Sequence, residues 1–118
     1  MIIFQQFTFD SAHFLPLVQD GHKCKNVHGH TYHISVYLEG ELDPEAGWVI
    51  DFSDVKKVIA PVIATIDHTL LNGVVGLENP TAENLAIWLW NKIKPELSSL
   101  KKIEIKETPT SGVIYKGY

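Results

Sequence analysis

The chain has 118 residues and a mass of 13.3 kDa, a length that predicts one domain spanning residues 1–118. Its ten basic residues are all lysines, and 14 acidic residues bring the net charge to −4. Arginine, which reads guanine and phosphate through two parallel hydrogen bonds, is missing, and this argues against sequence-specific nucleic-acid binding.

The single cysteine, Cys24, excludes an intrachain disulfide and fits a reducing compartment. The first residues lack the basic and long apolar segments of a signal peptide. No stretch approaches the ~20 apolar residues that a membrane-spanning helix needs. We therefore expect a cytoplasmic protein with neither a membrane nor a nucleic-acid partner.

The first predicted strand covers residues 2–13, where apolar and polar side chains alternate. His13 ends its largely apolar face, and taken alone this residue is best interpreted as a partly buried, hydrogen-bonded histidine. Residues 14–27 follow neither the strand nor the helix period. A loop of this length in a small domain is more often functional than decorative, and this one carries Cys24.

The second predicted strand, residues 28–39, begins with a cluster of histidines. Alternation places His28 and His30 on one face and His33 on the other. We therefore expect His33 to be an exposed polar residue and exclude it as a metal ligand.

The middle of the chain predicts a short strand at residues 48–50 that pairs back on the previous one. Ser53 is the expected N-cap of a helix whose apolar residues recur at helical spacing as far as Ile66. Pro61 lies inside this pattern and should kink or interrupt the helix.

A second long loop, residues 67–80, opens with the acid–base pair Asp67-His68. Neighbours on an extended segment point in opposite directions, so the sequence leaves open whether Asp67 orients His68. Thr81 is the expected N-cap of a second helix that ends near Pro95.

The last strands are predicted at residues 101–107 and 113–118. Glu107 continues an apolar face, so it should have a partner unless the strand has reached the surface there. The order strand, strand, helix, helix, strand, strand predicts an α+β domain, with a four-stranded antiparallel sheet and both helices on one face. Its bare edges and small core suggest assembly into an oligomer.

The histidines at the ends of the first two strands predict a zinc site. Catalytic zinc takes three protein ligands and keeps a fourth position open, and His13, His28 and His30 can supply the three. The alternative is a closed structural site with Cys24 as the fourth ligand. Cys24 lies between two lysines, Lys23 and Lys25. These charges can favour a thiolate, attract an anionic substrate or simply be solvated.

Several motifs, in order over essentially the whole chain, resemble the 6-pyruvoyl-tetrahydropterin synthase family, which includes the 6-carboxytetrahydropterin synthases of the queuosine pathway. The three-residue gap between Cys24 and His28 is similar to the queuosine-pathway branch. The motifs that carry the resemblance are Phe7-Thr8-Phe9-Asp10-Ser11-Ala12-His13, Cys24-Lys25-Asn26-Val27-His28-Gly29-His30, Gly47-Trp48-Val49-Ile50-Asp51-Phe52, Asp67-His68 with Leu71-Asn72, Pro80-Thr81-Ala82-Glu83-Asn84 and Lys106-Glu107-Thr108.

The resemblance implies a role for each matching residue. By position, Cys24 matches the catalytic cysteine, Asp67 and His68 match the pair that relays protons, and Glu107 matches the carboxylate that anchors the pterin. Thr81 stands where the family has a residue that lines the pterin pocket. The zinc ligands that the resemblance implies are His13, His28 and His30.

The implied fold is the tunnelling fold, with active sites at subunit interfaces of a homo-oligomer, typically a hexamer. The implied activity is that of a zinc-dependent lyase, which converts 7,8-dihydroneopterin triphosphate into 6-carboxy-5,6,7,8-tetrahydropterin, acetaldehyde and triphosphate. The alternatives are a 6-pyruvoyl-tetrahydropterin synthase, which eliminates triphosphate without breaking a carbon–carbon bond, and a non-catalytic module stabilised by zinc.

Overall fold

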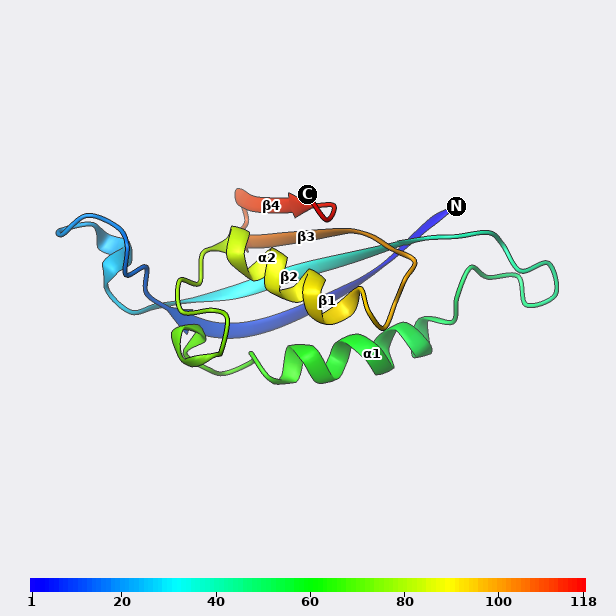
Figure 1. Ribbon diagram of the computed structural model, residues 1–118, viewed down its shortest axis with the longest axis horizontal. Helices are drawn as coiled ribbons and strands as arrows, with labels where there is room; N and C mark the ends of the chain where they lie inside the picture. Colours follow the sequence, from blue (N-terminus) through cyan, green and yellow to red (C-terminus); the bar gives the residue numbers. More distant parts are fainter.

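A computed structural model describes residues 1–118 and shows a four-stranded antiparallel sheet with two α-helices, in the predicted ββααββ order (Figure 1). The strands lie in the order β1-β2-β3-β4, so each strand pairs with its neighbour in the chain. The elements are β1 (Ile2–His13), β2 (His28–Glu39), α1 (Phe52–Ala64), α2 (Ala82–Ile93), β3 (Leu100–Thr108) and β4 (Ser111–Tyr115), with short 3₁₀ turns at Lys23–Lys25 and Leu71–Gly73. The predicted α+β fold class is confirmed.

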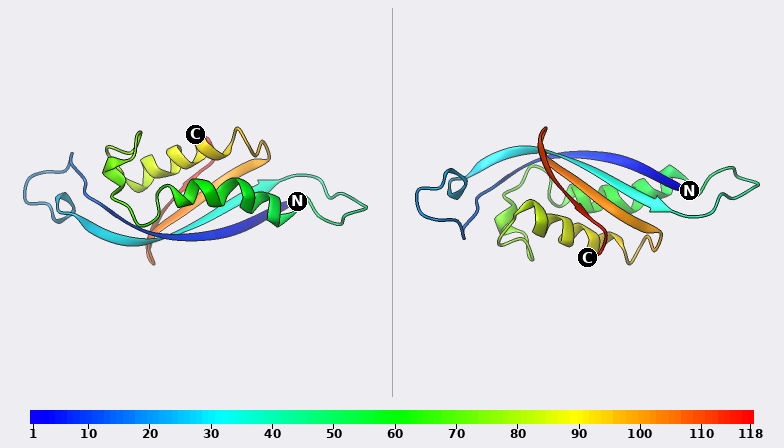
Figure 2. Two further views of the ribbon diagram at one scale, coloured as in Figure 1. Left: turned by 90° about the horizontal axis from the view of Figure 1, so that it is seen from below. Right: turned by 90° about the horizontal axis from the view of Figure 1, so that it is seen from above.

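Both helices cover the same face of the sheet: they lie in front of the strands in one view of Figure 2 and behind them in the opposite view. A core of 19 buried residues fills the space between the two layers. Alternate residues of β2, such as Tyr32, Ile34 and Val36, supply its sheet side, and the helices bury their apolar stripes against them. No helix has the length and apolar character to cross a membrane.

The long first hairpin determines where the functional residues lie. In its register Ser11 pairs with His30 and His13 pairs with His28. The imidazoles of these three histidines therefore project from the helix-facing side of the sheet, at one end of the hairpin. The loop of residues 14–27 extends from that end, and residues 40–51 extend from the opposite end (Figure 1).

Two local predictions were wrong, and the interruption that Pro61 could have caused in α1 does not occur. Residues 48–50 form no strand, because Trp48 uses its carbonyl to accept the N–H of Asp43 at 2.8 Å and so closes its own loop. The cap of α1 is Asp51, whose carboxylate accepts the N–H of Ser53 at 2.9 Å. Pro61 is exposed and does not break α1, which continues to Ala64.

Candidate active site

Three histidines converge at the end of the β1–β2 hairpin, as the strand pattern predicted. The register and the alternation of side chains bring His13, His28 and His30 to one point, where one nitrogen from each ring lies within 4.8 Å of the other two. The Nε2 atoms of His13 and His28 are 3.0 Å apart. A tetrahedral ion with metal–nitrogen distances of about 2.0–2.1 Å holds its nitrogen ligands about 3.4 Å apart, so this arrangement fits a metal after a small ring rotation.

The other ring nitrogens of this triad are held by backbone carbonyls. The Nδ1–H of His13 donates to the carbonyl of Pro80 at 2.8 Å, and that of His28 donates to the carbonyl of Asn26 at 2.8 Å. A donor at Nδ1 leaves the lone pair at Nε2, and metal-binding histidines are usually oriented in this way. Burial lowers the pKa of His30, which favours the neutral, metal-binding form; Glu107 opposes this shift and the two other histidines add to it.

Glu107 lies beside the histidine triad and not on a bare part of the surface. Its Oε1 lies 3.5 Å from Nε2 of His13 and 3.6 Å from Nε2 of His30, and the side chain is 26% exposed. The carboxylate therefore points to the opening above the triad, where a ligand can also reach it.

The triad, Glu107 and Cys24 line one cavity of about 410 Å³. Cys24 is a free, half-buried thiol, and it does not belong to the set of mutually close ligand atoms that the three histidines form. The remaining lining residues are Leu15 and Lys23.

The 14–27 loop brings Cys24 back to the sheet through its own hydrogen bonds. The N–H of Leu15 donates to the carbonyl of Cys24 at 2.8 Å, and the N–H of Cys24 donates to Nδ1 of His22 at 3.0 Å. Asn72 holds the base of the loop, because its side chain accepts the N–H of Phe14 at 3.0 Å and donates to the carbonyl of the same residue at 2.9 Å.

The Asp67–His68 pair lies along the outer edge of β1, which bonds to it through Asp10. Nδ1 of His68 is 2.8 Å from Oδ1 of Asp67, so the carboxylate does orient the imidazole and leaves Nε2 exposed. The sequence could not decide this point, because neighbours on an extended segment diverge. His68 has φ +53° and is the one non-glycine residue in the left-handed region, and this turn brings the two side chains together.

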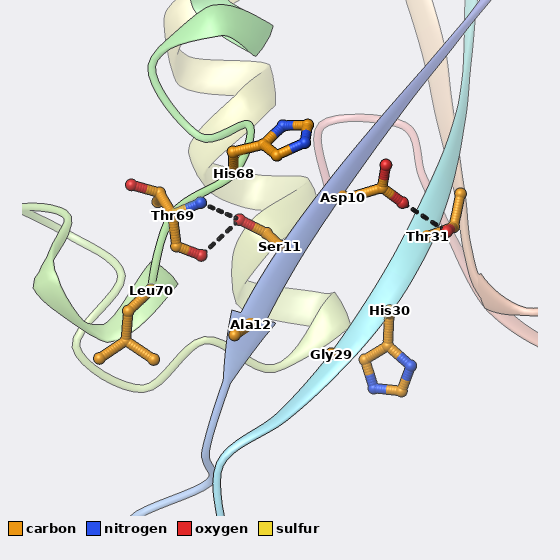
Figure 3. Close-up of a pocket in the computed structure, with 9 residues that line it drawn as sticks. All are labelled: Asp10, Ser11, Ala12, Gly29, His30, Thr31, His68, Thr69 and Leu70. Carbon is orange, nitrogen blue, oxygen red and sulfur yellow. Dashed lines mark hydrogen bonds between the residues drawn. The ribbon is translucent and has the colours of Figure 1, made fainter.

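β1 holds this strained turn from one side (Figure 3). The N–H of Asp10 donates to Oδ1 of Asp67 at 3.0 Å, and its carbonyl accepts the N–H of His68 at 2.6 Å. The buried hydroxyl of Ser11 contacts the carbonyls of Ile66 and Thr69 at 2.5 and 2.7 Å and accepts the N–H of Thr69 at 3.2 Å. The hydrogen bond from the Asp10 N–H holds the pKa of Asp67 below its usual value, and those from His68 lower it further.

His68 and Cys24 line different cavities. His68 faces a second cavity of about 580 Å³, together with Asp10, Thr31 and the edge of β1. The Thr31 hydroxyl donates to the Asp10 carboxylate at 2.5 Å, and both residues lie on the sheet face opposite the histidine triad. His30 lines both cavities, but His68 lines only the second and Cys24 only the first, so within one chain these two residues do not share a cavity. The sequence assigns no role to Asp10, Ser11 or Thr31, because their roles depend on the strand register and on backbone groups.

Thr81 caps α2 as predicted: its hydroxyl accepts the N–H of Asn84 at 3.1 Å. It lines a neighbouring cavity that shares Leu15 and Glu107 with the cavity of the triad. A role beside the pterin therefore stays a prediction for this residue.

The protein is a two-layer α+β domain in which three histidines that could hold a metal ion share one cavity with a carboxylate and a thiol. The family model described as 6-pyruvoyl tetrahydropterin synthase matches residues 2–118. The chain belongs to this family, so the resemblance seen in the sequence is confirmed and the chain is a member of a family of enzymes.

Curated relatives within this family have different names. A 6-carboxy-5,6,7,8-tetrahydropterin synthase of Synechocystis sp. is 36% identical over 97% of this chain and 92% of its own length. A dihydroneopterin monophosphate aldolase of Pyrococcus furiosus is 34% identical over 94% and 93%. The solved structure of Caenorhabditis elegans 6-pyruvoyl tetrahydropterin synthase superposes with a TM-score of 0.92 at 34% identity, covering 100% of this chain and 96% of that one.

Proposed function

We propose that this protein is the 6-carboxy-5,6,7,8-tetrahydropterin synthase of queuosine biosynthesis. It converts 7,8-dihydroneopterin triphosphate into 6-carboxy-5,6,7,8-tetrahydropterin, acetaldehyde and triphosphate, with zinc held by His13, His28 and His30. The names of several curated relatives support this activity. The single free cysteine fits a cytoplasmic setting, where thiols stay reduced.

One observation carries the proposal: the three histidines converge without Cys24, while Cys24 and Glu107 line the same cavity. Three protein ligands with an open fourth position are typical of catalytic zinc, whereas a structural site would be closed by the thiolate. The arrangement therefore supports a thiol that acts on a substrate rather than on the metal.

Each residue has a role that its geometry permits. Bound zinc would polarise the side-chain oxygens of the substrate and make the adjacent C–H acidic. Cys24 takes that proton as general base. Glu107 accepts two parallel hydrogen bonds from the amino group and ring N–H of the pterin. Thr81 lines the pterin pocket, a role supported by its place in the cavity that shares Leu15 and Glu107 with that of the triad.

The Asp67–His68 pair returns a proton to the substrate in this proposal, yet it faces another cavity than Cys24 in the same chain. We infer that a second copy supplies it, in a homo-oligomer with interfacial sites and, by family resemblance, six subunits. The sheet has free edges at β1 and β4, and Phe4 and Ile114 leave more than half of their surface exposed on these strands. Such features support sheet-to-sheet assembly.

The test is a product assay with zinc-loaded protein and 7,8-dihydroneopterin triphosphate, in which released aldehyde is trapped. Acetaldehyde together with 6-carboxytetrahydropterin is the expected result. A pyruvoyl product without acetaldehyde would instead assign the activity named for the C. elegans relative. Preferential turnover of the monophosphate would assign that of the P. furiosus relative.

The Cys24→Ala variant separates catalysis from a structural zinc site. We expect it to keep its zinc and lose turnover by about 10²–10⁴-fold, the usual contribution of a positioned acid–base group. Metal analysis after gel filtration measures the first quantity and the product assay the second. Loss of zinc from this variant would mean that Cys24 is a ligand and would favour a non-catalytic zinc-stabilised module.

A further inference from the structure

The cavity of the histidine triad must also receive three phosphate groups if the proposed function is correct, and the chain has no arginine to bind them. Three basic or titratable side chains lie next to Cys24: His22, Lys23 and Lys25. The sequence alone favours none of the three as the residue that binds the phosphates. The structure distinguishes them by their contacts.

Lys25 is already engaged. Its Nζ lies 2.6 Å from Oδ1 of Asp20 and donates to the carbonyl of Val18 at 3.3 Å. The ammonium is thus paired with a carboxylate on its own loop, and it does not line the cavity.

His22 is engaged as well, because its Nδ1 accepts the N–H of Cys24 at 3.0 Å. That contact uses the lone pair of the ring nitrogen, and a protonated ring would have no lone pair there. The imidazole therefore supports the turn that carries Cys24 and is not a cation for the substrate.

Lys23 differs from both. It lines the cavity together with Cys24, the triad and Glu107, and it forms no salt bridge within the chain. The charged residues that line the cavity are therefore one glutamate, Glu107, and one lysine, Lys23, whose ammonium has no ion-pair partner in the chain. The proposed substrate is complementary to this pair, since its pterin ring offers N–H donors and its other end carries several negative charges.

We propose that Lys23 binds the triphosphate of the substrate, an inference that rests on the proposed function and assigns a residue to the anionic part of the ligand. The ammonium acts as a mobile point charge on the phosphate oxygens. Because the chain as a whole is negative, removal of this charge should leave the triphosphate without compensation from this loop.

The test uses full-length, zinc-loaded protein with Cys24→Ala, which stops turnover so that dissociation constants can be measured. Two ligands are titrated at low ionic strength: 7,8-dihydroneopterin triphosphate and 7,8-dihydroneopterin. When Lys23→Ala is introduced into this Cys24→Ala protein, binding of 7,8-dihydroneopterin triphosphate should weaken about five- to tenfold, the range of a partly exposed charge-assisted contact. Binding of dihydroneopterin should change less than twofold, and the fivefold difference should shrink in 0.5 M salt because charges are then screened.

Lys25→Ala is the matched control, because Lys25 lies two residues along the chain and its substitution makes the same change in charge. It should weaken triphosphate binding less than twofold, and Lys23→Arg should restore most of the affinity that Lys23→Ala loses. An equal loss with both ligands, or an equal loss in Lys25→Ala, would overturn the assignment to Lys23 while leaving the proposed function intact. A parent protein that binds neither pterin would overturn the proposed function itself.

Discussion

The histidine triad and the Asp67–His68 pair are both built around β1, but by different means. The triad is positioned by regular strand geometry, because His13 and His28 are register partners and His30 follows two residues later on the same face. The pair is positioned by irregular backbone, a left-handed residue that β1 holds through its edge hydrogen bonds. The triad thus depends on strand register and side-chain alternation, whereas the Asp67–His68 pair depends on the loop that carries it.

The largest expected effect comes from breaking the triad. His28→Ala removes one of three ligands, and we expect zinc affinity to fall by more than about 100-fold, since even the loss of an outer partner costs 10- to 100-fold. Turnover should be lost with the metal. Zinc content after gel filtration and the product assay measure both effects.

His33→Ala is the control for that variant. His33 lies on the same strand, faces the opposite side of the sheet and is exposed, so zinc content and turnover should stay as in the parent. A comparable loss of zinc in His33→Ala would show that the strand, and not the triad, determines metal binding.

The next-largest effect tests whether Cys24 and His68 of one active site come from different copies of the chain. Cys24→Ala and His68→Ala should each be inactive as pure proteins. If the sites form between copies, unfolding and refolding an equal mixture restores sites with both native residues, about a quarter of the total by random assortment. Recovery near a quarter of parental turnover is therefore expected.

One further measurement completes this experiment. Light scattering coupled to size-exclusion chromatography should show an oligomer in all samples. No recovery of turnover in a correctly sized mixed oligomer would show that each chain completes its own site, in contradiction to the two cavities described above.

The sequence predicted the triad because strand alternation is a strong pattern, and the two-layer fold followed from the same pattern in each element. It placed Asp67 and His68 correctly in a loop but could not orient them, because a left-handed residue leaves no trace in hydrophobic periodicity. The carbonyls that hold the triad, from Pro80 and Asn26, are backbone groups and are invisible to any reading of side-chain types.

The failed prediction of a strand at residues 48–50 has a related cause. The segment is short and apolar, which is typical of a strand. The carbonyl of Trp48 instead accepts the N–H of Asp43 within the same loop, so it is not available for pairing with a strand. The N-cap of α1 was misplaced by two residues because Asp51 and Ser53 are both good caps, and only the backbone geometry decides between them.

A moderate effect is expected at the clasp, the set of hydrogen bonds that Asp10 and Ser11 of β1 form with residues 66–69. Ser11→Ala removes a buried hydroxyl that contacts two carbonyls and one N–H of the turn. We expect the free energy of unfolding to fall by about 1–2 kcal/mol. Turnover should fall several-fold, because the turn at His68 loses support, while zinc content stays unchanged.

Ser35→Ala is the matched control, since this buried serine on β2 accepts a hydrogen bond from Gln6 at 3.2 Å, away from both cavities. Urea unfolding should show a similar loss of stability without a loss of turnover. If both variants lose turnover equally, the effect of Ser11 is general destabilisation and not positioning of His68.

The smallest effect is the pH dependence of the contribution of Asp67 to stability. Its pKa is below the ordinary value of 3.8 in the folded protein, chiefly because the N–H of Asp10 donates to it. A group whose pKa is lowered by folding stabilises the protein above its unfolded pKa, and this contribution is lost as the pH falls through the folded pKa. The difference in urea midpoint between the parent and Asp67→Asn should thus be largest near neutral pH and shrink below about pH 4.

Asp51→Asn is the comparison for this variant, because the N–H of Ser53 likewise lowers the pKa of Asp51 at the start of α1. Both variants should lose their stability difference on acidification, but only Asp67→Asn should reduce turnover, since an amide cannot stabilise a protonated His68. A stability difference that grows as the pH falls would mean that the carboxylate of Asp67 is strained by its neighbours and that the clasp, not the charge, holds the pair in place.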